Sequence, residues 1–148
     1  MSYRLVPALD RDEAWLERLR REVYRELFDA TFGGWDEARH LRQFSECWKQ
    51  GGISVVEVDG VPVGMIQLFE RPEGLEVGEI QILPGHQNLG IGSRVLRDVI
   101  AQCHEQRRKV LLSVALKNDR AYRLYERLGF KLVGSSDTHN HMCFDPPS

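Results

Sequence analysis

The sequence predicts an α/β protein built on a sheet that is partly antiparallel and partly parallel. The hydrophobic patterns follow one another as a strand, two helices, three strands, a helix, a strand, a helix and two strands. An Asp-Gly pair at 59–60 separates the β-rich runs "ISVVEV" and "VPVGMIQLF", which is a strong hairpin signal. The apolar run "KVLLSVAL" later in the chain is typical of a strand buried on both faces.

Length and composition limit the class of protein. The chain has 148 residues, 42% of them hydrophobic and 28% charged, which fits one globular domain over 1–148. A net charge of −2 gives no general attraction to nucleic acid or to a membrane surface, so neither is expected as a partner. Three distant cysteines form no disulfide framework or zinc spacing. With no apolar run of signal-peptide or membrane-span length, we expect a cytoplasmic enzyme or binding protein.

The first third of the chain has the signals of a strand and two helices. Residues 3–9 form the strand, and Pro7 favours a sheet edge. Asp10 and Glu13 resemble a capping box at the start of the first helix. A Gly-Gly pair at 33–34 ends that helix, and Asp36 can cap the second one. The apolar helical positions are Leu16, Leu19, Val23 and Leu27, then Leu41, Phe44 and Trp48.

The rest of the chain alternates strands and helices. A turn at 72–74 precedes a strand over 75–83, in which Glu79 and Gln81 share the face opposite Gly78, Ile80 and Ile82. The apolar stripe over 95–103 predicts a helix, and the strand over 109–116 follows it. Another helix is capped by Asn118 and stopped by Gly129, and residues 130–134 and 139–144 form two final strands.

A glycine-rich turn, "GHQNLGIGSRVL" at 85–96, joins a strand to a helix. Such a turn presents backbone N–H groups at a helix N-terminus, where the partial positive charge favours phosphate. A nucleoside-triphosphate loop would need Lys and Ser or Thr after Gly90, but Ile91 and Gly92 stand there. A dinucleotide fingerprint beginning at Gly90 would need a third glycine where Val95 stands. The usual patterns for ATP and NAD therefore both fail.

A third pattern, Gln-x-x-Gly-x-Gly, fits residues 87–92. It follows the strand "EIQILPGHQ", and a second motif, "NDRAYRLYERLGF", comes later in the chain. On these motifs the chain resembles the GCN5-related N-acetyltransferase (GNAT) superfamily, over nearly its whole length and most strongly from 76 to 134. The resemblance implies about four helices and a mixed sheet of about seven strands, splayed between the fourth and fifth strands.

The resemblance also implies acetyl-CoA as cosubstrate, and the sequence itself gives no reason to expect a metal. The turn would hold the pyrophosphate, and the amide-rich arm of the cosubstrate would pair with the backbone of the preceding strand. Asn118 would contact that arm as well as cap its helix. The implied cofactor-binding residues are Ile80, Gln81, Ile82, Gln87, Asn88, Leu89, Gly90, Ile91, Gly92, Ser93, Asn118 and Tyr125.

Two residues are the catalytic candidates. Tyr125 matches the tyrosine of the family's second motif, whose phenol can protonate the leaving thiolate; the alternative is that Tyr125 only packs. Some relatives carry a glutamate base where Ser113 stands here, so Glu79 is the first candidate for the general base and Glu76 the second. The alternative for Glu79 is an ordinary solvated carboxylate.

The acceptor site of the family involves the first two helices and the last strands. Here Phe32 and Trp35 with Asp36 and Glu37 can receive a cationic amine, or they can serve as core, cap and helix reinforcement. His139-x-His141 puts two imidazoles on one strand face, but no third metal ligand is evident. That pair can equally be a solvated surface or border the acceptor site.

The sequence therefore predicts an acetyl-CoA-dependent N-acetyltransferase that acts directly on a primary amine of a small molecule or peptide. One alternative is a non-catalytic CoA-binding sensor or interaction module of the same fold. Another is a scaffold without cofactor, in which the glycines only form a tight turn. Exposed edge strands also favour a homodimer, which the sequence does not fix.

Overall fold

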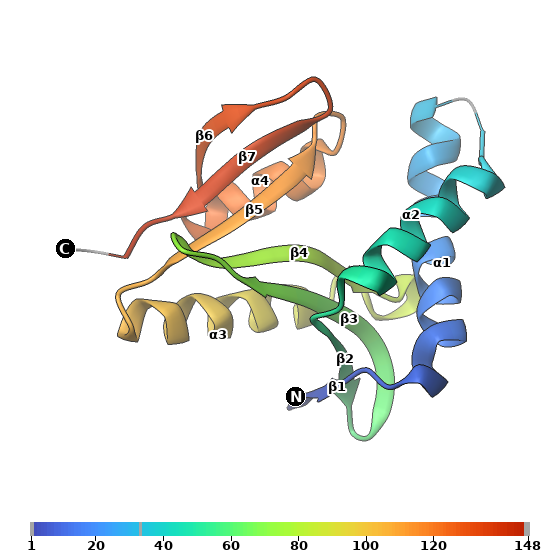
Figure 1. Ribbon diagram of the computed structural model, residues 1–148, viewed down its shortest axis with the longest axis horizontal. Helices are drawn as coiled ribbons and strands as arrows, with labels where there is room; N and C mark the ends of the chain where they lie inside the picture. Colours follow the sequence, from blue (N-terminus) through green and yellow to red (C-terminus); the bar gives the residue numbers. More distant parts are fainter. Residues whose placement is uncertain (1, 33, 147–148) are drawn as a thin grey trace. The chain divides into compact units, whose positions relative to one another are not determined.

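A computed structural model describes residues 2–32 and 34–146, with the side chains of 26–32 left out. Its elements follow the predicted order (Figure 1). They are β1 (Tyr3–Pro7), a 3-10 helix η1 (Asp10–Asp12), α1 (Glu13–Phe32), α2 (Glu37–Gln50), β2 (Ile53–Val58), β3 (Val61–Glu70), β4 (Gly74–Ile82), a 3-10 helix η2 (Pro84–His86), α3 (Ile91–Glu105), β5 (Lys109–Ala115), α4 (Asp119–Leu128), β6 (Lys131–Ser135) and β7 (His139–Phe144). None of these helices, as far as they are described, has the length and apolar composition needed to cross a membrane.

The strands form a seven-stranded mixed sheet in the order β1-β2-β3-β4-β5-β7-β6. β4 pairs with β5 in parallel, whereas β1–β2, β2–β3, β5–β7 and β6–β7 are antiparallel. The β4–β5 register runs only from Gly74↔Lys109 to Val77↔Leu112, although β4 continues to Ile82 and β5 to Ala115. The predicted mixed sheet with four flanking helices is thus confirmed.

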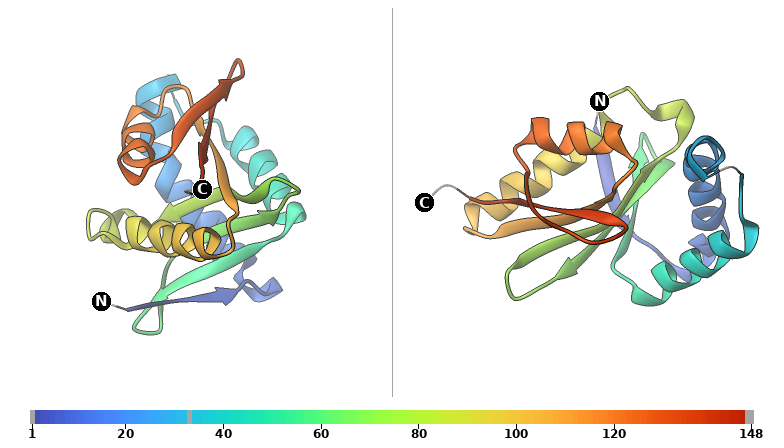
Figure 2. Two further views of the ribbon diagram at one scale, coloured as in Figure 1. Left: turned by 90° about the vertical axis from the view of Figure 1, so that its left-hand side faces the viewer. Right: turned by 90° about the horizontal axis from the view of Figure 1, so that it is seen from above.

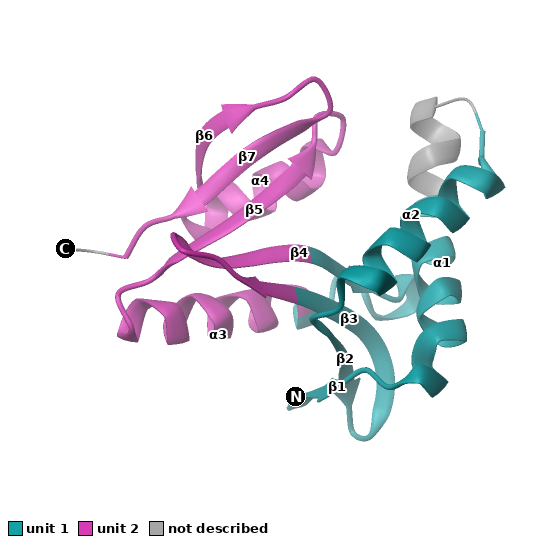
Figure 3. Cartoon of the chain, viewed as in Figure 1, with its two compact units in different colours: residues 1–67, 79–91 teal, residues 68–78, 92–148 magenta. Residues whose placement is uncertain are grey.

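The chain divides into two compact units that interleave in sequence (Figure 3). Unit 1 comprises residues 1–67 and 79–91, and unit 2 comprises 68–78 and 92–148. Strands β3 and β4 each contribute residues to both units. A single acetyltransferase domain over 1–148 stays a prediction.

In unit 1, two helices pack on one face of strands β2 and β3. The buried cluster consists of Leu16 and Leu19 from α1, Phe44 from α2, and Ile53, Val55 and Met65 from the strands. β1 lies at the end of the strand order, as Pro7 predicted. The β2–β3 hairpin turns at Asp59 and Gly60, both with positive φ (53° and 79°), as the Asp-Gly signal predicted.

The start of α1 differs from the sequence prediction. Asp10 and Glu13 form no capping box, because residues 10–12 make a 3-10 turn. The backbone N–H of Leu9 instead donates to Asp12 Oδ2 at 2.8 Å, and the N–H of Asp12 donates back to Leu9 O at 2.8 Å. The carboxylate of Asp12, three residues after Leu9, reaches the N–H of Leu9, and α1 begins directly after this 3-10 turn, at Glu13. The predicted core position Leu27 and the break at Gly33 lie outside the described residues.

In unit 2, α3 and α4 lie on the same face of β5 and β7 (Figure 2). Of the predicted helix stripe, Val95, Leu96, Val99 and Cys103 are buried, whereas Ile100 is only half-buried. The expectation that β5 is buried on both faces is wrong: Val110, Leu112 and Val114 are buried, but Lys109 and Ser113 are exposed. The helices of this unit cover one face only, so the alternate side chains of β5 stay accessible.

Candidate functional site

The glycine turn follows β4 and leads into α3. The side-chain N–H of Gln87 donates to Ile82 O at 2.9 Å, which ties the turn to the end of the strand. Asn88 and Gly90 have positive φ values of 66° and 81°. A Cβ at Gly90 would meet no atom within 4 Å, so the backbone conformation, and not packing, requires the glycine. The turn therefore leaves open space beside backbone N–H groups just before a 15-residue helix, as a phosphate site needs.

Glu79 on β4 is held by two side chains. The hydroxyl of Tyr24 on α1 donates to Glu79 Oε2 at 2.8 Å, and Gln81 Nε2 lies 3.4 Å from the same oxygen. Gln81 is buried, so this face of β4 is covered. The predicted base is thus a hydrogen-bonded carboxylate on a packed face. Sequence reasoning missed Tyr24, whose helical pattern gives no sign of a partner 55 residues away.

The second candidate base, Glu76, belongs to unit 2 and has an ion-pair partner. Its Oε1 lies 2.7 Å from Arg71 Nε, across the turn that precedes β4. Arg71 also stacks over Phe69, with Cζ 4.9 Å from the ring centroid. Glu76 therefore stabilises the turn through its ion pair with Arg71. Because Glu76 has this structural role, Glu79 stays the first candidate for the base.

A polar network connects α1 and α2 in unit 1. Arg20 Nη1 donates to His40 Nδ1 at 3.0 Å, and Arg20 Nη2 donates to Gln43 Oε1 at 2.6 Å. His40 Nε2 lies 2.8 Å from Glu17 Oε1. Arg21 pairs with Glu17 and, at 2.5 Å, with Glu37 Oε2. Arg20 and His40 are only 6% and 2% exposed, so this network is buried at its centre.

The hydrogen bonds fix the protonation of His40. A guanidinium only donates, so Nδ1 must accept from Arg20 and the ring proton lies on Nε2, facing the Glu17 carboxylate. Burial lowers the pKa of His40, more than Glu17 raises it, and the imidazole is neutral at pH 7. Burial alone would raise the pKa of Glu17, but its hydrogen bonds from His40 and Arg21 lower it. The hydrogen bond from Arg21 likewise lowers the pKa of Glu37.

Two groups of residues carry side-chain atoms of the kinds that bind metals. Glu17, Glu37 and His40 bring three ligand atoms within 4.8 Å of one another. Arg21 already pairs with both carboxylates, and the Nε2 proton of His40 faces Glu17, so a cation would have to displace Arg21. In the pair suggested by sequence, His139 Nδ1 lies 2.8 Å from Thr138 Oγ1 and His141 Nδ1 lies 2.8 Å from Ser113 Oγ.

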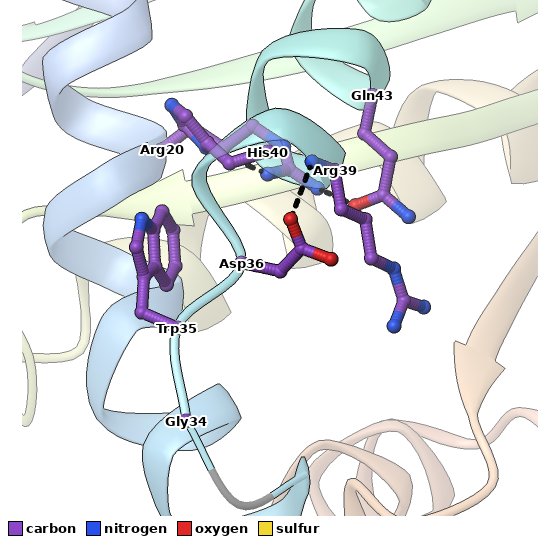
Figure 4. A pocket seen from close by; sticks show the side chains of 7 residues that line it. All are labelled: Arg20, Gly34, Trp35, Asp36, Arg39, His40 and Gln43. Atoms are coloured by element: carbon purple, nitrogen blue, oxygen red, sulfur yellow. Dashed lines mark hydrogen bonds between the residues drawn. The ribbon is translucent and has the colours of Figure 1, made fainter.

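A pocket of about 130 Å³ lies beside this network, between α1 and α2. Its lining residues are Arg20, Gly34, Trp35, Asp36, Arg39, His40 and Gln43 (Figure 4). Asp36 Oδ1 accepts the backbone N–H of Arg39 at 3.0 Å, as the predicted cap of α2. Glu37 pairs with Arg21 and lies 3.4 Å from Trp35 Nε1. Both acids therefore serve the helix and its network, and the side chain of Phe32 lies outside the described residues.

The second motif forms α4 in unit 2. The backbone N–H of Ala121 donates to Asn118 Oδ1 at 3.2 Å, and Gly129 ends the helix with φ 106°, both as predicted. The predicted face of α4, which includes Tyr125, is half-buried. The Tyr125 ring meets Phe130 edge-on, with centroids 6.0 Å apart. The Tyr125 ring thus has a packing role, and the proton transfer by its hydroxyl stays a prediction.

Comparison with known proteins decides the family. The acetyltransferase (GNAT) family profile matches residues 20–130, which is three quarters of the chain. The chain belongs to the GNAT acetyltransferase family. An uncharacterised N-acetyltransferase of Archaeoglobus fulgidus is 29% identical over 116 residues, covering 73% of this chain and 79% of that protein.

Solved GNAT-type structures show the same fold. The PaiA N-acetyltransferase of Thermoplasma acidophilum, crystallised with coenzyme A, has a TM-score of 0.75 at 16% identity, covering 98% of this chain and 99% of that one. Arabidopsis thaliana Naa50, in complex with the bisubstrate analogue CoA-Ac-MVNAL, has a TM-score of 0.65 at 17% identity, covering 97% and 98%. The segment that matches the GNAT profile contains Glu79, the glycine turn, Asn118 and Tyr125.

Proposed function

We propose that this GNAT protein transfers an acetyl group from acetyl-CoA directly to a primary amine. The observation that carries the proposal is the turn at Gln87–Ser93: a strand end, two positive-φ positions, open space at Gly90 and a helix start in one stretch. This arrangement fits a pyrophosphate, because the N–H groups and the helix N-terminus favour negative charge. The coenzyme A complexes of related folds support the same ligand.

The binding roles follow from the local structure. The backbone N–H groups of residues 88–93 hold the pyrophosphate; these residues are Asn88, Leu89, Gly90, Ile91, Gly92 and Ser93. Gln87 contributes by fixing the turn, since its own N–H donates to Pro84 O at 3.3 Å and its side chain donates to Ile82 O. The backbone of Ile80, Gln81 and Ile82 pairs with the amide arm, because the β4–β5 register ends at Val77 and leaves these groups without β5 partners. The side chain of Asn118 adds a contact to that arm. No metal is needed for this binding.

The catalytic roles belong to Glu79 and Tyr125. Acetyl-CoA, when bound, supplies an activated acetyl thioester. Glu79 takes the proton of the attacking amine, directly or through a water molecule, and Tyr24 and Gln81 hold its carboxylate in place. The Tyr125 hydroxyl donates a proton to the leaving thiolate.

The acceptor is an amine of a small molecule or a peptide. The peptide-bearing analogue bound to Naa50 supports an amine acceptor in this family. A homodimer is a further prediction, since β6 ends the strand order and is exposed along its length. A cytoplasmic location is also still a prediction.

Thermal unfolding with added ligand tests the cosubstrate. Acetyl-CoA or CoA at about a hundred times its dissociation constant adds roughly 2.7 kcal/mol and raises the midpoint by about 5 to 10 °C, while ATP and NAD leave it unchanged. Gly90→Trp fills the open space and abolishes the rise. Gly60→Trp is the matched control, because Gly60 has nearly the same φ (79°) and the same open surroundings. A folded Gly90→Trp protein that still binds CoA tightly contradicts the turn assignment.

Release of CoA with a panel of amines then tests the transfer. Turnover with any amine supports an enzyme, whereas CoA binding without turnover on the whole panel supports a CoA-sensing module instead. If neither acetyl-CoA nor CoA raises the unfolding midpoint, the glycine turn has a structural role only.

A further inference from the structure

We infer that the pocket between α1 and α2 binds a carboxylate, and that the acceptor of this protein is therefore an amine that also carries a carboxylate group. The pocket contains a buried arginine that faces neutral groups. The assignment to an acceptor rests on the proposed acetyl transfer, but the binding of a carboxylate does not. All residues of the argument lie within unit 1.

Arg20 is the centre of the site. Its guanidinium is always charged, and the side chain is only 6% exposed. Removing such a cation from water costs several kcal/mol unless a counter-charge is present. Among the side chains that the structure describes, no carboxylate forms an ion pair with Arg20. A buried guanidinium with two neutral acceptors is thus a preformed site for an anion, because its planar fork matches a carboxylate.

The three side chains that contact Arg20 directly are uncharged. His40 is a neutral imidazole that accepts from Arg20, and Gln43 accepts through its amide oxygen. The ring of Tyr24 lies beneath the guanidinium, with Arg20 Cζ 4.9 Å from the ring centroid. These three contacts orient the guanidinium without neutralising it, so its charge is available to a ligand.

The lining as a whole favours an anion. It contains two arginines, Arg20 and Arg39, and one acid, Asp36. The Asp36 carboxylate caps α2, where the positive end of the helix offsets its charge. The acids that suggested a cationic acceptor are thus engaged: Asp36 in the cap and Glu37 with Arg21. The pocket therefore favours an anionic group of the ligand, whereas Asp36 and Glu37 had suggested a cationic one.

Tyr24 connects this pocket to the proposed general base. Its ring contacts Arg20, and its hydroxyl donates to Glu79 Oε2 at 2.8 Å. The anion site and Glu79 are thus separated by one tyrosine side chain. An acceptor that spans this distance presents its carboxylate to Arg20 and its amine to Glu79. This favours compounds with several bonds between the two groups, such as ω-amino acids or the ε-amine of lysine.

Pairs of amines that differ only in this charge test the inference. The pairs are 6-aminohexanoate with 6-aminohexanamide, and L-lysine with L-lysinamide. Because a charged hydrogen bond is worth about 1.5 to 3 kcal/mol, the carboxylate member of each pair should have a kcat/KM on the order of 10- to 100-fold higher. Equal turnover of both members refutes the carboxylate pocket and leaves the acetyl transfer intact.

Substitutions assign the preference to the pocket. Arg20→Gln should raise KM for 6-aminohexanoate until it equals that of the amide, with little change for the amide. Since Arg20 is buried, Arg39→Gln provides a second variant on the exposed rim, with a smaller loss of preference. Arg42→Gln, on the same helix but outside the pocket, is the control and should keep the full preference. A preference that survives both pocket substitutions in folded protein overturns the inference.

Ligand binding without turnover separates the two proposals. Titration of the protein with 6-aminohexanoate in the presence of CoA should show binding that Arg20→Gln abolishes, even if no acetyl group is transferred. Such a result would support the pocket and refute the transfer. CoA affinity should be equal in wild type and Arg20→Gln. A loss of CoA affinity in Arg20→Gln, but not of dephospho-CoA affinity, would show that the pocket serves the 3′-phosphate of the cosubstrate and would overturn the inference.

Discussion

Replacing Asn118 separates two roles that one side chain is predicted to have. Its Oδ1 accepts the N–H of Ala121 at 3.2 Å, which is the long end of the usual range, so the cap is worth about 1 kcal/mol. α4 has only ten residues and depends strongly on such a cap. Asn118→Ala should therefore lower the unfolding midpoint by about 2 to 4 °C.

Asn118→Ser is the matched variant, because serine caps a helix about as well as asparagine. Its unfolding midpoint should stay within about 1 °C of wild type. The serine lacks the amide that we propose to contact CoA, so CoA affinity should fall roughly 3- to 10-fold, as for one neutral hydrogen bond.

Thermal unfolding without ligand and calorimetric titration with CoA measure the two effects separately. An unchanged midpoint in Asn118→Ala would refute the estimate of the cap. Wild-type CoA affinity in Asn118→Ser would show that Asn118 acts on α4 alone and has no contact with the cosubstrate.

Three further predictions concern other residues. Tyr125→Phe should keep CoA affinity and lose most turnover in a CoA-release assay; full turnover would leave Tyr125 with its packing role only. Burial lowers the pKa of His40 below its unfolded value near 6.5, so the stability from the neutral ring is complete above pH 6.5 and is lost as the pH falls through the folded pKa. Thermal unfolding between pH 7.5 and 5.5 should therefore show a steeper loss in wild type than in His40→Gln, and parallel curves would argue against this. Burial raises the pKa of the half-buried Cys47 to about 11, so iodoacetamide at pH 8 should label it much more slowly in folded than in unfolded protein. Equal labelling rates of Cys47 in the two states, measured by mass spectrometry, would contradict the raised pKa.

Features that depend on neighbouring residues in the chain could be predicted from residue type and spacing. The caps at Asp36 and Asn118, the stop at Gly129 and the hairpin at Asp59-Gly60 each involve groups within a few residues of one another. Residue type and spacing therefore sufficed to predict them. The same holds for the order of strands and helices, since each follows from a local hydrophobic period. The predicted cap at the start of α1 was wrong, because Asp12 accepts the N–H of Leu9 and the capping pair lies one residue earlier in the chain than Asp10 and Glu13.

The contacts between polar groups that are distant in the chain depend on tertiary packing. Arg20 finds His40 and Gln43 on α2, and Tyr24 finds Glu79 on β4, over separations of 20 to 55 residues. These meetings depend on how α1 packs against α2 and the sheet, which no local pattern specifies. The exposure of one face of β5 also depends on tertiary packing, because the helices of unit 2 cover only the other face. The positive charge in the pocket likewise results from packing. Asp36 caps α2 and Glu37 pairs with Arg21, whereas the buried Arg20 from α1 lines the pocket.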